Sequence, residues 1–203
     1  MYDILELVGQ SLVDLITIIL SEDRSMPEFI PIRPFDEASV NVSLKSPSDQ
    51  ASGVSVYLYT VKHNAYMHSM REEVPSNDPN GNDGYNIQKF DMNLDLYYMI
   101  TPQFKDNHPL ELKVIERILQ VINGVNVLGG GLLKPELAGT GNDQIRMEPI
   151  SLTLDEINKI WSIFPNQSYH LSLYYQLTPV KIKSFAAPEF AFSTSKKEVG
   201  FRK

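Results

Sequence analysis

The sequence predicts an α+β fold: a mainly antiparallel, mixed sheet of four to six strands with two or three helices packed on it. Two observations support this fold class. The hydrophobic patterns run in the order helix, three or four strands, helix, short strand, helix, long strand and tail, which is typical of α+β proteins. The 203 residues, 42% of them hydrophobic, are enough to bury one sizeable core.

The N-terminal part of the chain contains a helix and then strands. Apolar residues recur at helical spacing over residues 2–20, so we expect an amphipathic helix that packs on a sheet or a partner. Three prolines within residues 26–34 favour an extended segment, and the polar, Gly- and Pro-rich residues 75–86 predict a mobile loop. Alternating apolar residues predict three strands, at residues 40–44, 54–61 and 90–100. The third has the clearest alternation, so it should be central.

A second helix is predicted after residue 107. Pro109 suits its first turn, and Gly124 is placed as the residue that follows its end. Its apolar stripe consists of Leu112, Ile115, Leu119 and Ile122. Residues 129–142 contain five glycines, which predicts a second mobile loop, and residues 145–147 form a short strand.

The best-defined helix start is at Thr153. As the N-cap, Thr153 forms a capping box with Glu156, Leu152 and Ile157 are placed for a hydrophobic staple, and Pro165 ends the helix after about three turns. Its apolar face consists of Leu154, Ile157, Ile160, Trp161 and Phe164. From Tyr169 the period changes to that of a strand, with Leu171, Leu173, Tyr175 and Leu177 on one face. We expect Leu154, Ile157, Trp161 and Leu173 to lie in the core.

The composition excludes several classes of protein. There is no cysteine, so disulfides, thiolate metal sites and thiol catalysis are excluded. Residues 181–203 carry six cations and two carboxylates, a charge of +4, which leaves −11 for the rest of a chain with net charge −7. An acidic body argues against nucleic acid as the main partner. The charge asymmetry favours docking between like copies or onto another protein.

No constellation of catalytic or metal-binding residues is complete. Gly124 and Gly129 have the spacing of a phosphate loop, but the Lys and Ser or Thr that should follow are missing. His63 and His68 are five residues apart instead of the four that would place both on one helix face. No serine lies in a Gly-x-Ser-x-Gly elbow. We therefore expect no enzyme activity, no catalytic residue, no cofactor and no metal.

The polar sides of the predicted strands carry tyrosines, and His170 lies on the same side. The residues concerned are Tyr57, Tyr59, Tyr97 and Tyr174. Aromatic side chains with a polar tip are enriched at protein interfaces, so one interpretation is a partner-binding face. The other is that a helix covers this face, which requires the same side chains.

The tail, residues 185–203, alternates small, aromatic and basic residues. It is either a disordered terminus or an arm that docks on a neighbour through main-chain hydrogen bonds to an exposed sheet edge. If the tail is such an arm, we expect Phe190 and Phe192 to be its anchors. Its cations are then Lys196, Lys197, Arg202 and Lys203. We expect a domain at residues 1–184 followed by this arm.

Four blocks of the chain carry a resemblance to a known family. They are residues 53–61 (GVSVYLYTV), 94–101 (LDLYYMIT), 149–161 (PISLTLDEINKIW) and 169–176 (YHLSLYYQ). Their order and spacing over residues 1–184 resemble the cap, or tail-terminator, family of phage-tail-like extracellular contractile injection systems of the virulence-cassette and antifeeding-prophage type. The block that begins at Pro149 is the most specific, and the chain departs from the pattern at residues 123–126 and 129–131.

The resemblance implies a structural protein with a tail-terminator-like fold. It implies a ring of identical chains, expected to be a hexamer, that closes the distal end of the inner tube, touches the last sheath layer and ends tube and sheath polymerisation. The implied partners are the tube and sheath proteins, with no nucleic acid and no direct membrane insertion, and the implied assembly is cytoplasmic, in a released or membrane-attached particle. The alternatives are a small-ligand-binding or catalytic domain with its site in residues 129–141, and an adaptor elsewhere in the particle.

Overall fold

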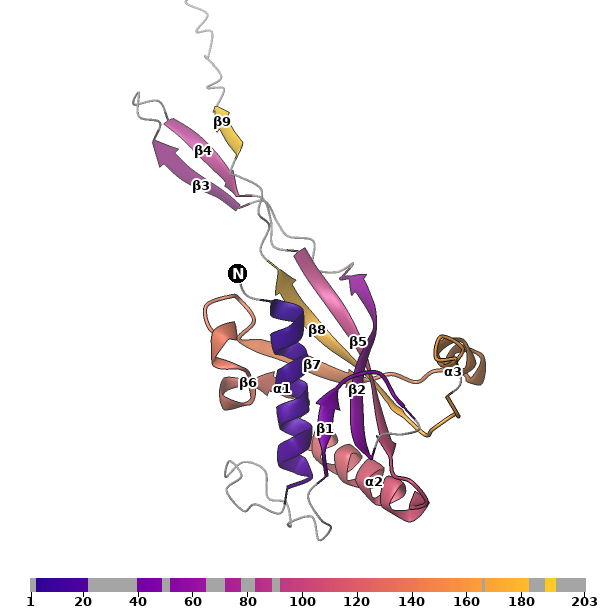
Figure 1. The fold of residues 1–203 in the computed structure, drawn as a ribbon. Helices are drawn as coiled ribbons and strands as arrows, with labels where there is room; N and C mark the ends of the chain where they lie inside the picture. The colour runs from indigo at the N-terminus through magenta and orange to yellow at the C-terminus, as the bar shows by residue number, and fades with distance from the viewer. Residues whose placement is uncertain are drawn as a thin grey trace, which may run out of the picture.

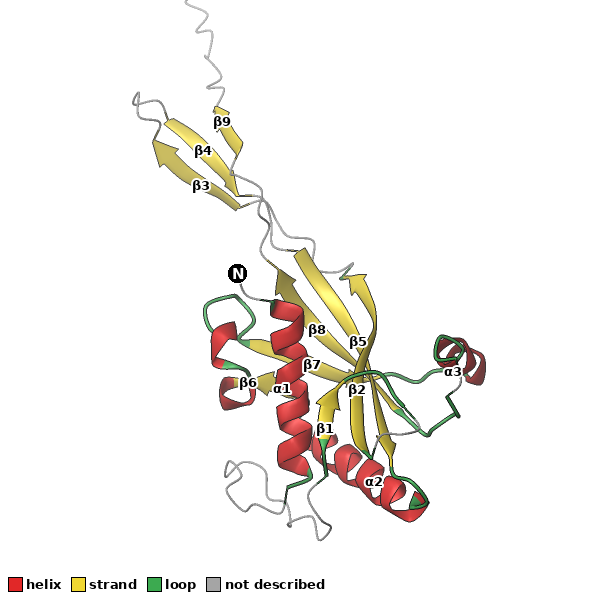
Figure 2. Ribbon diagram, in the orientation of Figure 1, coloured by secondary structure: helices red, strands yellow, loops and turns green. Residues whose placement is uncertain are grey.

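The structure is a computed structural model that describes residues 3–21, 40–48, 52–64, 92–165 and 167–182, together with the backbone of residues 72–77, 83–88 and 189–192. Within these residues it contains three α-helices, one six-stranded sheet and one three-stranded sheet (Figures 1 and 2). The α-helices are α1 (Ile4–Ile19), α2 (His108–Gly124) and α3 (Leu154–Trp161). This arrangement confirms the predicted α+β class.

The six-stranded sheet is mixed, and its strands are far apart in sequence. In spatial order they are β1 (Val42–Leu44), β2 (Gly53–His63), β5 (Met92–Gln103), β8 (Leu173–Ile182), β7 (Gln144–Pro149) and β6 (Val127–Gly129). β1 and β2 pair in parallel, and the other neighbouring strands pair antiparallel. β5 is central, as predicted, although it continues to Gln103, and residues 90 and 91 lie outside the described residues.

A second sheet replaces the predicted loop at residues 75–77 and 83–86, whereas residues 78–82 lie outside the described residues. It consists of β3 (Glu72–Asn77), β4 (Asp83–Gln88) and β9 (Glu189–Phe192), all antiparallel, and Figure 1 shows it apart from the six-stranded sheet. The prediction was made from side-chain composition, whereas the ladder is held by main-chain hydrogen bonds. Pro75 is compatible with this sheet because β3 is an edge strand, where a missing N–H is tolerated.

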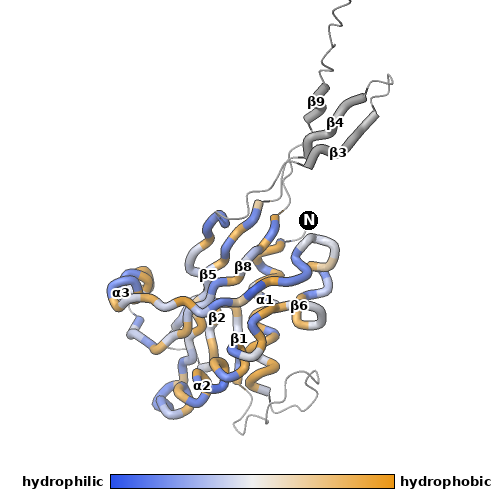
Figure 3. The backbone as a smooth tube through the Cα atoms, turned by 180° about the vertical axis from the view of Figure 1, so that it is seen from behind, coloured by the Kyte–Doolittle hydropathy of each residue, from blue (hydrophilic) through white to orange (hydrophobic). Residues whose placement is uncertain are grey.

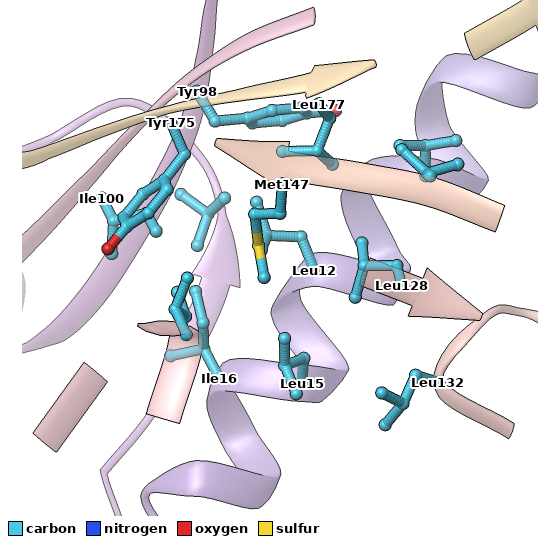
Figure 4. Close-up of a cluster of buried hydrophobic side chains, with 14 of the residues drawn as sticks. Leu12, Leu15, Ile16, Tyr98, Ile100, Leu128, Leu132, Met147, Tyr175 and Leu177 are labelled. Carbon is cyan, nitrogen blue, oxygen red and sulfur yellow. The ribbon is translucent and has the colours of Figure 1, made fainter. Parts of the chain in front are cut away.

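The main core lies between one face of the six-stranded sheet and α1. The predicted amphipathic helix is confirmed, and its buried apolar residues are Val8, Leu12, Leu15, Ile16 and Ile19. Figure 4 shows three of these side chains beside residues of β5, β7, β8 and β6. From behind, Figure 3 shows hydrophilic and hydrophobic stretches alternating along β5 and β8, as expected when only one sheet face meets the core.

α1 also approaches β1 closely. A Cβ at Gly9 would lie 3.0 Å from a methyl carbon of Leu44 and 3.1 Å from the hydroxyl of Tyr98, so only glycine allows this spacing without a shift. The extended segment predicted at residues 26–34 lies outside the described residues. Of the helices that the structure describes, none combines the length and hydropathy needed to cross a membrane.

The apolar stripe predicted for α2 is partly wrong. Leu112 and Leu119 are 47% and 44% exposed. The buried apolar residues are Val114, Ile115, Ile118, Val121 and Ile122. Apolar residues occupy two overlapping stripes of this helix, and contact with the rest of the fold selects one of them. Gly124 is the last helical residue instead of the residue beyond the end, and Val125 is the C-cap.

Residues 129–142 differ from the predicted mobile loop, because part of this segment is regular and buried. They contain two short 3-10 helices, η1 (Gly130–Leu132) and η2 (Pro135–Leu137), whose Leu132 and Leu137 are buried. Asn142 is fully buried and accepts a hydrogen bond from the Lys181 amide (2.7 Å) while donating one to the Lys181 carbonyl (2.9 Å). The Asn142 side chain therefore forms the two hydrogen bonds with the Lys181 main chain that a neighbouring strand would otherwise form with β8.

Candidate interaction site

The helix that the capping box predicts begins where expected. The Thr153 hydroxyl accepts a hydrogen bond from the Glu156 amide (3.4 Å), and the Glu156 carboxylate accepts one from the Thr153 amide (2.9 Å). The Thr153 hydroxyl also donates a hydrogen bond to the Glu156 carboxylate (2.8 Å). The two hydrogen bonds that this carboxylate accepts from Thr153 lower the pKa of Glu156, the one from the backbone most strongly. Leu152 and Ile157 both pack against the same small cluster of side chains, as a staple requires.

Two details of this region differ from the prediction. α3 ends at Trp161 and has 8 residues, so it is shorter than three turns, and β8 starts at Leu173 instead of Tyr169. Leu154 was expected in the core but is 78% exposed. So short a helix buries only a narrow stripe, here Ile157, Ile160 and Trp161, and Leu154, the first residue after the cap, lies outside it.

α3 packs on the outer face of the sheet, which is the face opposite the main core. Its Trp161 is 8% exposed and forms a second core with Met99 of β5 and Tyr174 of β8. Met99 and Tyr174 are directly paired, whereas their neighbours Tyr98 and Tyr175 point into the main core. The sheet therefore has apolar residues on both faces beneath α3.

The structure brings the four predicted tyrosines together on this outer face. The Tyr59 ring lies 6.0 Å from the Tyr174 ring and 6.2 Å from the Tyr97 ring, and Tyr57 lies 5.3 Å from Phe164, all in edge-to-face geometry. We call these tyrosines, with Trp161 and Phe164, the aromatic cluster. Tyr174 is buried, so the helix-covered interpretation holds for it, whereas the other three tyrosines are half-buried.

Burial raises the pKa of three of these tyrosines. It raises the pKa of Tyr59 to about 12, with further contributions from Tyr174, Tyr97 and Glu156, and it also raises the pKa of Tyr97 and Tyr174. At neutral pH the rings of Tyr59, Tyr97 and Tyr174 therefore carry a neutral hydroxyl that can form hydrogen bonds. This suits recognition of a partner better than acid–base chemistry.

Two polar atoms inside the aromatic cluster lack hydrogen bonds. The Trp161 Nε1 and the Tyr174 hydroxyl are both buried without a partner. Burial raises the pKa of Tyr174, whereas the Trp161 and Ser172 side chains lower it, so both of these groups lie close to the Tyr174 hydroxyl. The Trp161 Nε1 and the Tyr174 hydroxyl nevertheless do not meet the distance and angle criteria of a hydrogen bond.

Beyond the cluster the outer face is polar, and none of the helices that the structure describes covers it. The Lys62 ammonium lies 4.7 Å from the centre of the Tyr97 ring, a cation–π contact. Next to it, one carboxylate oxygen of Asp95 accepts hydrogen bonds from the side-chain amide of Asn64 (2.7 Å) and from the Thr178 hydroxyl (2.5 Å). The Asp95 carboxylate thus joins β5 to β8 and to the end of β2.

His170, which the sequence groups with the tyrosines, contacts a residue that sequence reasoning missed. Its ring lies 6.1 Å from Trp161, and its Nδ1 lies 3.9 Å from a carboxylate oxygen of Glu111. Glu111 also accepts hydrogen bonds from the Phe104 amide (3.0 Å) and pairs with His108 (2.9 Å). Glu111 lies on α2, and no local pattern links it to residue 170.

A groove lies on the other side of the molecule, between α1 and η1. It has a volume of about 610 Å³ and is lined mainly by apolar side chains, including Leu15, Ile18 and Leu133. At its edge Lys134 pairs with Asp14 (2.5 Å), so its two charged groups neutralise each other. Among the described residues, no group of three or more His, Asp or Glu side chains could hold a metal.

The remaining predicted site residues belong to the tail. Phe190 and Phe192 lie in β9, which pairs with β4 of the same chain, but their side chains are not described. Lys196, Lys197 and Arg202, like Lys203, lie outside the described residues. The predicted docking of this arm on a neighbour stays a prediction.

Comparison with known proteins gives one family match. A family model described as the Pvc16 N-terminal domain matches residues 8–192. No curated protein matches the sequence. The match covers both sheets, all three α-helices except the first residues of α1, and the aromatic cluster.

Solved structures with a similar fold come from contractile injection systems. The anti-feeding prophage cap, described as the AFP tube terminating cap, has a TM-score of 0.55 and 14% sequence identity over 97% of this chain and 60% of that chain. The PVC sheath/tube terminator in the extended state has a TM-score of 0.48 and 16% identity over 97% and 64%. This chain spans less than two thirds of either relative, so these matches concern its fold.

Proposed function

Since the chain belongs to the Pvc16 N-terminal domain family, we propose that it is a structural cap of a contractile injection system. In this proposal a ring of copies, expected to be a hexamer, closes the distal end of the inner tube and contacts the last sheath layer. Subunits of the tube and sheath then find no free end, so polymerisation stops. The chain carries out no chemistry, and its partners are other copies of itself, the tube protein and the sheath protein.

The observation that carries the proposal is the family match across residues 8–192. The fold shared with the tube terminating cap at a TM-score of 0.55 supports it. The charge distribution is also suitable, because an acidic body followed by a basic tail favours contacts between different surfaces of like copies. Such head-to-tail contacts close into a ring at a fixed copy number.

We place the contact with a neighbour on the half-buried part of the aromatic cluster and on the arm. Tyr59 and Tyr97 combine a ring with a neutral hydroxyl, and Lys62 adds a cation beside them. Aromatic residues bordered by polar groups are the usual composition of an interface centre. The arm, residues 185–203, is proposed to extend this contact beyond the domain of residues 1–184.

The function is tested by the length of particles assembled without the chain. Particles would be produced with the gene intact, deleted, and restored from a plasmid, and tube and sheath lengths would be measured by electron microscopy. We expect a broad length distribution after deletion and a narrow one after restoration. Unchanged lengths and unchanged stability of the extended sheath would refute the capping role. A labelled chain found at the opposite end of the particle would favour an adaptor instead.

The ring is tested separately by size-exclusion chromatography with light scattering. Six copies of 23.0 kDa give about 138 kDa, and the mass should fall at low concentration toward that of one chain. Tyr97→Ala should shift this equilibrium toward the monomer. Leu112→Ala is the matched control, because Leu112 is 47% exposed on α2 and does not belong to the aromatic cluster. A monomer at all concentrations, or equal effects of both variants, would contradict the proposed interface.

The groove between α1 and η1 supports a second candidate, a small-ligand-binding domain. Its apolar walls and volume of about 610 Å³ fit a small ligand. Gly131 lines the groove, and a Cβ there would meet nothing within 4 Å, so Gly131→Trp places a large side chain at the groove without a clash at the Cβ. Native mass spectrometry of the purified protein should show no additional bound mass. A bound mass that Gly131→Trp abolishes would favour ligand binding.

A further inference from the structure

The α3 region differs from the rest of the fold in how it is attached. Figure 1 shows α3 at the side of the sheet, away from α1 and β6. α1 and α2 bury their apolar stripes in the main core, whereas α3 contacts the sheet through the small second core. α3 and the residues beside it are therefore attached through this smaller second core, which surrounds Trp161, and through the contact of His170 with Glu111.

The two ends of this region are held by the sheet. The Ile150 amide donates a hydrogen bond to the Tyr174 carbonyl (2.9 Å), and the hydroxyls of Ser172 and Thr101 are 2.8 Å apart. Between these points lie residues 151–171, which we call the α3 cover; the structure describes all of it except residue 166. Both ends of the cover are therefore fixed to the sheet.

The docked position leaves polar groups unsatisfied. Trp161 Nε1 and the Tyr174 hydroxyl are buried without hydrogen-bond partners, and both side chains are 8% exposed. A buried donor that has lost water and found no partner disfavours the state that buries it. Lifting the cover returns both groups to water, so this penalty applies only when the cover is closed.

The side of the α3 cover that faces away from the sheet carries apolar side chains that are exposed to water. Its exposed apolar side chains are Leu154 (78%), Ile163 (53%), Tyr169 (57%) and Leu171 (44%). Four of the nine large exposed apolar residues among the described residues therefore belong to this short segment. Their contact with water in the docked position gives no energy to hold the cover closed.

We propose that the α3 cover opens as a unit over the outer face of the sheet while the main core stays folded. Opening separates Trp161 from Met99 and Tyr174 and uncovers the buried part of the aromatic cluster. Segments with few buried contacts open locally at a lower free energy than the whole domain. This inference concerns the isolated chain and does not rest on the proposed function.

Thiol labelling tests the opening directly, because the chain has no cysteine of its own. Met99→Cys places a thiol beneath the cover, and Met147→Cys places one in the main core; the two methionines are 0% and 1% exposed. Each variant would react with 5,5′-dithiobis(2-nitrobenzoate) at low urea concentrations, and the rate would be divided by that of the unfolded chain.

We expect Met99→Cys to react at least ~100-fold faster than Met147→Cys, with a weaker dependence on urea, because a local opening exposes less surface. Equal corrected rates with equal urea dependence would mean that Met99 is reached only by global unfolding, which would overturn the proposal. Amide hydrogen exchange of the unsubstituted protein gives a check without substitutions. Protection in α3 equal to that in β5 would also overturn it.

The role of the unpaired hydroxyl has its own matched pair of variants. In the Met99→Cys background, Tyr174→Phe removes that hydroxyl with little change of shape and should slow labelling by at least ~5-fold. Tyr175→Phe, in the adjacent residue that faces the main core, should leave labelling unchanged. Faster labelling in Tyr174→Phe would show that the hydroxyl holds the cover closed and would refute this explanation.

Discussion

Replacing Gly53 with alanine tests how β1 joins the sheet. Gly53 is the first residue of β2 and has a φ of +139°, which L side chains rarely adopt. A Cβ there would lie 2.2 Å from the carbonyl oxygen of Asn41, a distance at which one group must move. The same carbonyl accepts the hydrogen bond of the Val54 amide (2.8 Å), so moving it breaks the first contact of the parallel β1–β2 pair.

The expected loss of stability is the sum of two effects. The unfavourable backbone conformation costs about 1–3 kcal/mol, and a lost hydrogen bond with its buried groups adds about 1 kcal/mol. Gly53→Ala should therefore lower the free energy of unfolding by about 2–4 kcal/mol, measured by urea denaturation followed by circular dichroism.

Gly124→Ala is the control for this experiment. A Cβ at Gly124 would meet nothing within 4 Å, and the residue ends α2 without a positive φ. Since alanine is favoured over glycine in helices, this variant should be as stable as the unsubstituted chain or gain up to about 1 kcal/mol. A Gly53→Ala protein within about 0.5 kcal/mol of the unsubstituted chain would refute the reasoning, because the β1–β2 junction would then tolerate a side chain.

Three further predictions use the same denaturation assay. Thr153→Ala should cost about 1 kcal/mol through the lost cap, and Thr153→Ser should restore most of it; no difference between the two would contradict the role of the hydroxyl. Asn142→Ala should cost about 2–4 kcal/mol, because the amide and carbonyl of Lys181 both lose their buried partner, and a cost below about 1 kcal/mol would show that water replaces it. The pKa of Tyr59 is raised from 10.0 to about 12, so the folded chain holds this proton more tightly than the unfolded chain. The free energy of unfolding should therefore fall as pH rises from 10 to 12. Tyr59→Phe should make this fall shallower, and an equally steep fall in the variant would contradict the prediction.

Part of the candidate site could be predicted from the sequence because strand alternation is a local property. The side chains of Tyr57, Tyr97 and Tyr174 were assigned to one side of their strands by period two alone, and the register of β2, β5 and β8 brings them together. The partner-binding role of these tyrosines stays a prediction. Their environment could not be predicted, because Trp161 reaches Met99 only through the path that the chain takes between β7 and β8.

Local signals in the sequence by themselves determined α1, the start of α3 at Thr153 and the alternation of β5, because each depends on residues within one or two turns or one strand. Tertiary structure alone decided which stripe of α2 is buried, why Leu154 faces water, and why Asn142 is fully buried. It also paired β9 with β4, about a hundred residues earlier in the chain. These outcomes depend on contacts between distant residues, and a local pattern compatible with two packings cannot choose between them.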